Sequence, residues 1–348
     1  MRIAQVSPLY EAVPPKLYGG TERVVSFLTE ELVRRGHEVT LFASGDSETS
    51  ARLVPCVPRA LRLDPNSKDW ISAHILQLEE VVRRAGEFDF IHFHLDTLAF
   101  PFARRISTPH LSTLHGRLDL PELGPLYREF REHPVVSISN DQRKPLPFAN
   151  WVGTVYHGLP GDLLRFRPGP GSYLAFLGRI SPEKRPDRAI EIARRAGIPL
   201  KIAAKVDKAD QDYFQEVIKP LLDDPLVEFV GEVDEKGKQE FLGNALALLF
   251  PIDWPEPFGL VMIEAMACGT PVVAFRRGSV PEVMEDGVTG FVVDTVDQAV
   301  KAVERLGALD RAACRRVFEE RFTVERMARD YLRLYAKVTR SSVHLPAA

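Results

Sequence analysis

Short apolar runs alternate along this chain with longer segments of helical periodicity. Such alternation is typical of strand-helix-strand units, in which helices cover both faces of a parallel sheet. It occurs in two successive series. In the first half we expect strands at Ile3–Ser7, Val39–Ala43, Phe90–His94, His110–Leu114 and Val135–Ile138. In the second half we expect them at Tyr173–Leu177, Leu200–Ala204, Val227–Val230, Ala247–Phe250, Pro271–Phe275 and Phe291–Val293. The sequence therefore predicts an α/β chain with two doubly wound sheets.

The length of the chain also favours two domains. Its 348 residues exceed the size at which a single hydrophobic core usually keeps growing. A segment rich in Pro and Gly, Leu159–Gly171, separates the two series and is the best candidate for a boundary. We therefore predict one domain over 1–163, a second over 164–322, a C-terminal helix over 323–340 that packs back toward the first domain, and a tail over 341–348. A cleft between the two domains is then expected.

Two helices are particularly clear. In Thr21–Arg35 the apolar residues follow helical spacing, and Gly36 ends the pattern. The segment Thr323–Val338 has an amphipathic pattern.

The composition excludes several kinds of partner and location. A formal charge of −3, from 45 basic and 48 acidic residues, provides no global basic field for nucleic acid or an acidic membrane surface. The three cysteines, Cys56, Cys268 and Cys314, lack metal-ligand spacing and are odd in number, so we expect reduced thiols in a cytoplasmic protein. No apolar stretch reaches 18 residues, so we expect neither secretion nor a transmembrane segment.

The most informative stretch is Pro251–Ala274, whose pattern predicts a strand end, a loop, a helix, a turn and a strand. Glu256 lies before the predicted helix Phe258–Cys268, and Glu264 lies inside it, roughly 8 Å along the axis. The first amide groups of that helix, those of Phe258, Gly259 and Leu260, form a natural site for a diphosphate. Spacing alone is equally compatible with an ordinary helix start that carries a stabilising acidic residue.

The sequence E-P-F-G-L-V-M-I-E-A-M-A-C-G-T-P-V-V-A in this stretch closely resembles the donor motif of family 4 glycosyltransferases, and the similarity extends from Met1 to about Tyr335. The resemblance implies the GT-B fold, with two Rossmann-like domains facing each other across a cleft. The first domain would hold the acceptor and the second the nucleotide-sugar donor. It assigns Glu264 to the ribose hydroxyls, Glu256 to hydroxyls of the transferred sugar, and the intervening amides to sugar and phosphate oxygens.

Cations follow two strands of the second series. Arg179 and Lys184 lie in the loop after Tyr173–Leu177, where two fixed positive charges suit a departing diphosphate. An isolated basic pair is usually solvated, but G-R-x4-K matches the diphosphate-binding pair of the family. Lys205 follows the next strand, where relatives often have a glycine-rich turn, and both a third phosphate contact and a plain surface charge remain open. The loop at Val233 resembles the segment that flanks the nucleobase.

In the first series, the glycines of Pro14–Glu22 let the backbone approach a ligand at the start of a helix, although they equally suit a capped turn. The resemblance makes Gly19 and Gly20 candidates for the donor side, and Lys16 and Tyr18 candidates for acceptor contacts.

His115 ends a strand and resembles the histidine that contacts the transferred sugar in this family. Relatives commonly have His-Asp where this chain has His115-Gly116. A carboxylate next to this histidine is therefore expected to be absent. His92, His94 and Asp96 alternate along another strand and invite a metal interpretation. We discount it, because we expect only one residue to project to each face in turn and because family members need no metal. His94 and Asp96 remain candidates for an acceptor pocket, with a core or rim role as the alternative.

The function implied is that of a retaining glycosyltransferase of the hexosyltransferase type, which needs no metal or other cofactor. Its donor would be a nucleoside diphosphate sugar, UDP- or GDP-linked, and its acceptor an alcohol, a sugar or a lipid-linked molecule. We expect it in the cytoplasm or at the membrane surface facing it. A nucleotide-sugar epimerase, or a catalytically weak nucleotide-sugar-binding protein of the same fold, is the alternative.

Two other classes of doubly wound protein fit less well. A dinucleotide-dependent oxidoreductase would carry G-x-G-x-x-G after a strand, and the chain has none. A nucleotide hydrolase needs a phosphate-binding loop, but Gly231–Gln239 is one residue too long and lacks Ser or Thr after Lys238.

Overall fold

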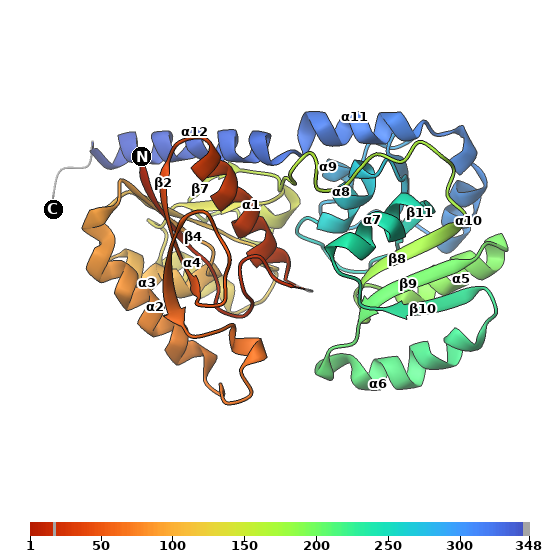
Figure 1. Ribbon diagram of the computed structural model, residues 1–348, viewed down its shortest axis with the longest axis horizontal. Coiled ribbons are helices and arrows are strands. Elements are labelled where there is room, and N and C mark those ends of the chain that lie inside the picture. The colour runs from red at the N-terminus through yellow and green to blue at the C-terminus, as the bar shows by residue number, and fades with distance from the viewer. Residues whose placement is uncertain (17–18, 344–348) are drawn as a thin grey trace. The chain divides into compact units, whose positions relative to one another are not determined.

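The computed structural model describes residues 1–16 and 19–343, and it divides into two compact units. Unit 1 consists of Met1–Gly158 together with the segment that begins at Val324, and unit 2 is Leu159–Thr323. Each unit is a parallel sheet with helices packed on both faces (Figure 1). The chain passes from unit 1 to unit 2 a few residues before the boundary predicted at 163, and it returns close to the second boundary predicted at 322.

The sheet of unit 1 has seven parallel strands in the order β3-β2-β1-β4-β5-β6-β7. They are β1 Arg2–Val6, β2 Glu38–Ser44, β3 Arg52–Val57, β4 Phe90–Phe93, β5 His110–Thr113, β6 Val135–Ser137 and β7 Trp151–Thr154. The five predicted strands are present with slightly different ends. The two edge strands, β3 and β7, were missed because they are only partly buried, and because Pro55 interrupts the first and Gly153 the second.

The helices of unit 1 are α1 Gly20–Arg34, α2 Trp70–Arg84, α3 Phe100–Ala103, α4 Leu123–Glu129 and α12 Val324–Val343. Helix α2 begins where the side chain of Asp69 accepts hydrogen bonds from the amides of Ile71 and Ser72. Helix α12 packs against α1 and against β5 and β7 (Figure 1). Its side chains Tyr331 and Tyr335 are fully buried. The C-terminal helix is therefore part of the core of unit 1.

The sheet of unit 2 has six parallel strands in the order β10-β9-β8-β11-β12-β13. They are β8 Tyr173–Arg179, β9 Leu200–Lys205, β10 Val227–Gly231, β11 Ala245–Phe250, β12 Val272–Phe275 and β13 Gly290–Val293. Side chains of these strands pack with α5 and α10 into a continuous apolar core. All six strands were predicted from short runs that are mostly apolar, as is typical of a sheet covered on both faces. The edge strand β10 is the exception in burial, because it contains Glu228 and is partly exposed.

The helices of unit 2 are α5 Pro186–Ala196, α6 Gln211–Tyr213, α7 Glu235–Gly243, α8 Leu260–Ala267, α9 Val280–Val283, α10 Val296–Glu304 and α11 Arg311–Arg321. Helix α8 begins later than predicted, because Gly259 has φ +81° and precedes the helix. A Cβ atom on Gly259 would lie 2.9 Å from Cε of Met262, so the turn needs glycine. Glu264 is therefore about 6 Å from the helix start rather than the 8 Å expected.

In both units the strand order reverses beside the first strand, between β1 and β4 in unit 1 and between β8 and β11 in unit 2. Ligands of doubly wound sheets bind at the carboxyl ends of the strands at this point. The loops after β1 and β4, and those after β8 and β11, are therefore where a site is expected. Within residues 1–16 and 19–343, no helix combines the length and the apolar character needed to cross a membrane.

Candidate active site

In unit 2 the structure brings Lys184 and Glu256 into direct contact. Lys184 lies in the loop between β8 and α5, and Glu256 lies in the loop between β11 and α8. Nζ of Lys184 donates a hydrogen bond to Oε2 of Glu256, and Nε1 of Trp254 donates to the same oxygen at 3.0 Å. Nζ of Lys184 also lies 5.0 Å from the ring centroid of Trp254. Two residues that were predicted to bind different parts of the donor thus form one largely buried ion pair.

The loop that carries Glu256 is held by a close backbone approach. A Cβ atom on Gly278 would lie 2.4 Å from both N and O of Glu256, so only glycine fits there. The amide of Ser279 donates to the carbonyl of Glu256 at 2.9 Å, and its Oγ donates to the carbonyl of Phe258 at 2.8 Å. Gly278 and Ser279 therefore fix the position of Glu256, although the sequence analysis did not identify them.

Asp253, three residues before Glu256, is surrounded by arginines. Its carboxylate accepts hydrogen bonds from Arg188 at 2.7 Å and from Arg185 and Arg277 at 3.3 Å. Its amide donates to the carbonyl of Glu183 at 2.8 Å. Burial alone would raise the pKa of Asp253, but Arg188 and Arg277 outweigh this effect and lower it. These contacts tie the loop of Lys184 to the loop of Glu256.

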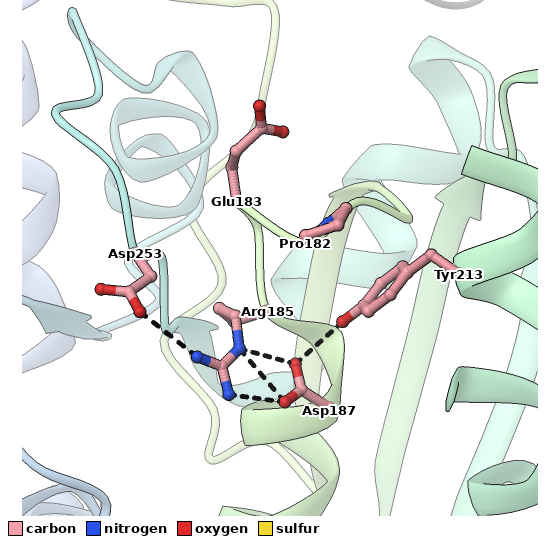
Figure 2. Close-up of a pocket in the computed structure, with 6 residues that line it drawn as sticks. All are labelled: Pro182, Glu183, Arg185, Asp187, Tyr213 and Asp253. Carbon is pink, nitrogen blue, oxygen red and sulfur yellow. Dashed lines mark hydrogen bonds and ion pairs between the residues drawn. The ribbon is translucent and has the colours of Figure 1, made fainter. Parts of the chain in front are cut away.

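Beside Asp253 lies an open hollow of about 410 Å³ (Figure 2). Arg185 points into it, with two nitrogens on the carboxylate of Asp187 and a third on Asp253 (Figure 2). Arg185 has φ +55°, which is unusual for a residue other than glycine. The lining residues are Pro182, Glu183, Arg185, Asp187, Tyr213 and Asp253. Because Arg185 follows Lys184 directly, its ion pairs stabilise the turn that presents Lys184.

Arg179 and Lys205 end the adjacent strands β8 and β9 and share an acidic partner. Nη1 of Arg179 lies 3.5 Å from Oδ2 of Asp207 and 3.4 Å from Oδ2 of Asp210, and Nζ of Lys205 lies 3.1 Å from Oδ1 of Asp207. Burial would raise the pKa of Asp207, but Lys205 and Arg179 lower it overall. Lys205 is thus drawn beside Arg179 at the carboxyl edge of the sheet, and its two alternatives, phosphate contact or surface charge, remain open.

Glu264 is buried on α8, with 4% of its surface exposed, and it is paired with Lys238 of α7. Nζ of Lys238 donates to Oε1 of Glu264 at 2.6 Å. The other donor-side candidates of this region, Val233 and Phe258, lie just before α7 and α8 respectively. Lys238 was not predicted as a partner of Glu264, because nothing in the sequence indicates that α7 and α8 are neighbours.

In unit 1 His115 belongs to a chain of buried hydrogen bonds. Its Nε2 lies 2.9 Å from Nδ1 of His94, and Nε2 of His94 lies 2.8 Å from Oε1 of Gln5. The side-chain Nε2 of Gln5 donates to the hydroxyl of Tyr335 at 3.2 Å. That hydroxyl also lies 2.8 Å from Nδ1 of His92. The chain therefore connects His115 with helix α12.

These contacts define the protonation of His115. Oε1 of Gln5 can only accept, so Nε2 of His94 carries hydrogen and Nδ1 of His94 accepts from Nε2 of His115. Burial lowers the pKa of His115 to about 3, so its ring is neutral near pH 7. The ring stacks on His157, with centroids 5.4 Å apart.

The prediction that His92 and His94 project to different faces of the sheet was wrong. Their ring centroids lie 3.9 Å apart, because residues at alternate strand positions share a face of the sheet. Within the described part of the chain, no group of three or more His, Cys, Asp or Glu side chains is arranged to hold a metal ion.

Asp96 places a carboxylate beside His115, which corrects the expectation that none would be there. Oδ1 of Asp96 accepts from the amide of His115 at 2.9 Å, and Oδ2 would lie 3.7 Å from a Cβ atom on Gly116. Asp96 adopts φ +45°, and burial raises its pKa. The carboxylate beside His115 therefore comes from the loop after β4.

The loop after β1 leads into α1. A Cβ atom on Gly19 would lie 2.8 Å from that of Pro15, and Gly20 is the first residue of α1. Lys16 is exposed, and Tyr18 lies outside the described residues. Glu22 in the first turn was not predicted as a site residue, yet it is buried, and burial raises its pKa to about 7.

Two family models match the chain. The model for glycosyltransferase family 4 matches residues 18–133, and the model for glycosyl transferases group 1 matches residues 166–318. The chain belongs to glycosyltransferase family 4. The predicted family and the predicted enzyme class, a hexosyltransferase-type glycosyltransferase, are therefore confirmed.

Two curated relatives of this family 4 glycosyltransferase are similar along most of their length. D-inositol 3-phosphate glycosyltransferase from Frankia alni is 29% identical, over 85% of this chain and 90% of the relative. Phosphatidyl-myo-inositol mannosyltransferase from Mycobacterium leprae is 26% identical, over 87% and 86%.

Solved structures show the same fold. Sucrose-phosphate synthase from Thermosynechococcus elongatus superposes with a TM-score of 0.76 at 20% identity, over 98% of this chain and 100% of the other. HepE from Anabaena, solved with UDP and glucose, gives a TM-score of 0.74 at 18% identity, over 97% and 99%. The predicted GT-B fold is confirmed.

Proposed function

We propose that this family 4 glycosyltransferase transfers a hexose or a related sugar from a nucleoside diphosphate to a hydroxyl group, with retention of anomeric configuration and without a metal ion. The observation that carries the proposal is the buried pair of Lys184 and Glu256 at the carboxyl ends of β8 and β11. A carboxylate is suited to accept hydrogen bonds from sugar hydroxyls, and an adjacent ammonium group is suited to bind a phosphate oxygen.

The positive charge needed at the departing diphosphate is assigned to protein side chains. Arg179, Lys184 and Lys205 lie in or directly after adjacent strands of unit 2. Fixed cations stabilise the negative charge that develops on the phosphate as the sugar leaves. The amides of Phe258, Gly259 and Leu260, at the start of α8, would add hydrogen bonds to phosphate or sugar oxygens.

In the proposed reaction the bond between the anomeric carbon and the phosphate oxygen breaks, and the acceptor oxygen bonds to the same carbon on the same face. The acceptor proton passes to the leaving phosphate oxygen, and the nucleoside diphosphate departs. Glu256 and the neutral His115 are assigned to orienting the sugar, and no protein atom forms a covalent bond. A glycoside hydrolase would instead place two carboxylates on either side of the bond.

The relatives support a choice of substrates for the first assays. HepE was solved with UDP and glucose, which favours a UDP-linked donor, and the mannosyltransferase relative keeps GDP-linked mannose as a second choice. The inositol-directed relatives favour a polyol, free or lipid-linked, as acceptor. The three free cysteines support the cytoplasm as the proposed location.

The test is release of nucleoside diphosphate from UDP-glucose and GDP-mannose, measured with and without a panel of polyol and sugar acceptors and in the presence of EDTA. We expect release that depends on the acceptor, persists in EDTA and yields a product whose anomeric signal in NMR matches that of the donor. Conversion of the donor sugar to its epimer without acceptor would favour an epimerase. An inverted product, or loss of turnover in EDTA, would contradict the proposal.

A further inference from the structure

The pair formed by Lys238 and Glu264 is separate in sequence from the pair formed by Lys184 and Glu256. Glu264 is inside helix α8, and Lys238 is in the second turn of α7. Their side chains are only 5% and 12% exposed, and the N–O distance is 2.6 Å. Removing a carboxylate this far from water is costly unless a positive charge lies beside it. Lys238 provides that charge.

The ammonium group of Lys238 contacts one of the two oxygens of the Glu264 carboxylate. Lys238 donates to Oε1, and among the residues that the structure describes none donates a hydrogen bond to Oε2 of Glu264. An ionised carboxylate can accept hydrogen bonds at both oxygens. The Glu264 carboxylate is thus oriented by Lys238, and its Oε2 can accept a further hydrogen bond.

Lys238 also belongs to the segment that follows the predicted nucleobase loop. Asp234 caps α7 by accepting from the amide of Gly237 at 2.8 Å, directly after Val233. The ion pair therefore connects the helix that follows the base loop with the helix that carries Glu264.

We propose that Lys238 is a positioning residue for nucleotide recognition, which holds the Glu264 carboxylate so that Oε2 accepts a hydrogen bond from the ribose diol. The inference rests on the proposed function, because it takes Glu264 as the ribose-binding residue. Lys238 acts through Glu264, with which it forms its ion pair. The diphosphate is assigned to the cations at the ends of β8 and β9.

The experiment compares two ligands that differ only in the ribose hydroxyls. Isothermal titration calorimetry measures Kd for UDP and for 2′,3′-dideoxy-UDP, with GDP and its dideoxy analogue as the alternative base. Wild-type protein is compared with Lys238→Met, Lys238→Arg and Glu264→Gln. The matched control is Lys201→Met, which breaks the exposed ion pair of Lys201 with Glu228 in the same unit.

In wild-type protein and in Lys201→Met we expect the ribonucleotide to bind at least about tenfold more tightly than the dideoxy analogue, a difference typical of one good hydrogen bond to a charged group. Lys238→Met should lose most of this preference and bind the dideoxy analogue nearly as wild type does. Lys238→Arg should retain part of the preference, because it keeps the positive charge. Equal weakening of both ligands in Lys238→Met, or an unchanged preference, would overturn the inference.

Lys238→Met leaves a buried carboxylate without its partner and is therefore expected to lose thermal stability. The double variant Lys238→Met with Glu264→Gln removes that charge, and it should recover stability while still lacking the ribose preference. If the double variant keeps the preference, Glu264 does not read the ribose and the inference fails.

The failure of the inference can be distinguished from failure of the proposed function. Wild-type protein that prefers the ribonucleotide, together with a Lys238→Met variant that prefers it equally, overturns only the role of Lys238. Wild-type protein that binds neither UDP nor GDP contradicts the nucleotide donor, and the role of Lys238 with it.

Discussion

The ammonium group of Lys184 and the carboxylate of Glu256 are hydrogen-bonded to each other, although 72 positions separate them in the sequence. Each was assigned a different ligand group, one the diphosphate and the other the sugar. Their contact means that each residue sets the charge and the orientation of the other. Substituting either one therefore affects both assigned groups.

Lys184→Met should reduce kcat by about 10²–10³, because it removes a charge that stabilises the leaving diphosphate. The variant also leaves Glu256 without its cation, so some loss of thermal stability is expected. Steady-state kinetics with the donor that the nucleoside diphosphate release assay identifies, together with a thermal melt, would measure both effects. Lys201→Met is the control and should retain wild-type kcat. A Lys184→Met variant with near-wild-type kcat would contradict the diphosphate assignment.

Asp253→Asn tests whether the surrounding arginines position the loop of Glu256. The change removes the charge that Arg185, Arg188 and Arg277 share. We expect kcat to fall roughly tenfold to a hundredfold, because small displacements of positioning groups are costly in catalysis.

The thermal midpoint of Asp253→Asn should change little, since the residue is partly exposed and such ion pairs contribute about 0–1 kcal/mol. Asp297→Asn, which removes the exposed partner of Arg195, is the matched control and should leave kcat unchanged. Equal kcat values for the two variants would contradict a positioning role for Asp253.

The sequence predicts strands well where the sheet is covered on both faces. Strands β8 and β11 lie in the middle of their sheet, and each contains a run of five or six apolar residues, Tyr173–Leu177 and Ala245–Phe250, that is recognisable in the sequence. Strand β3 lies at an edge, contains Pro55 and is partly exposed, so its pattern resembles that of a loop. The edge strands β10 and β13 of unit 2 were nevertheless predicted, so position in the sheet alone does not decide which strands can be recognised. In β3 the interruption by Pro55 adds to the effect of exposure.

The site could be predicted only in part. Arg179 and Lys184 are site candidates because they closely follow a predicted strand, and Glu256 and Glu264 because they belong to a resembling motif; their roles stay predictions. Lys238 and Gly278 act through contacts with distant segments, and Asp96 supplies a carboxylate from a neighbouring strand end. Contacts of this kind depend on strand order, which one sequence does not specify.

Tyr335→Phe tests the buried hydrogen bonds that connect α12 with β1 and β4. The hydroxyl group of Tyr335 bonds with Gln5 and His92, so its removal leaves two buried polar groups without a partner. We expect the free energy of unfolding to fall by about 1–3 kcal/mol, measured by urea denaturation.

Tyr127→Phe is the matched control for that experiment. The hydroxyl group of Tyr127 is also buried, and it has no hydrogen-bond partner among the described residues. Removing it should leave the protein equally stable or make it more stable. Equal destabilisation by both substitutions would mean that the bonds of Tyr335 contribute nothing beyond packing.

Glu22→Gln should change how the stability of the protein depends on pH. Burial raises the pKa of Glu22 to about 7, above the ordinary glutamate value of 4.5 that applies in the unfolded chain. Between these pH values the folded protein therefore binds more protons at this position than the unfolded chain. Because the unfolded chain keeps this ordinary pKa, the free energy of unfolding of the wild type decreases as pH rises through this range, by up to about 1.4 kcal/mol per pH unit from this group. Glutamine resembles the protonated form and does not titrate.

The stability of Glu22→Gln relative to wild type should therefore be close to zero at pH 4.5 and should rise to roughly 2–3 kcal/mol in favour of the variant near pH 7.5. Urea denaturation of both proteins across this range measures the difference. The buried histidines, among them His94 and His115, have lowered pKa values and oppose this trend, because the unfolded chain takes up their protons on acidification. Both proteins contain them, so their effect cancels in the difference. A difference that does not vary with pH would show that the pKa of Glu22 is the same in the folded and the unfolded protein, which contradicts this prediction.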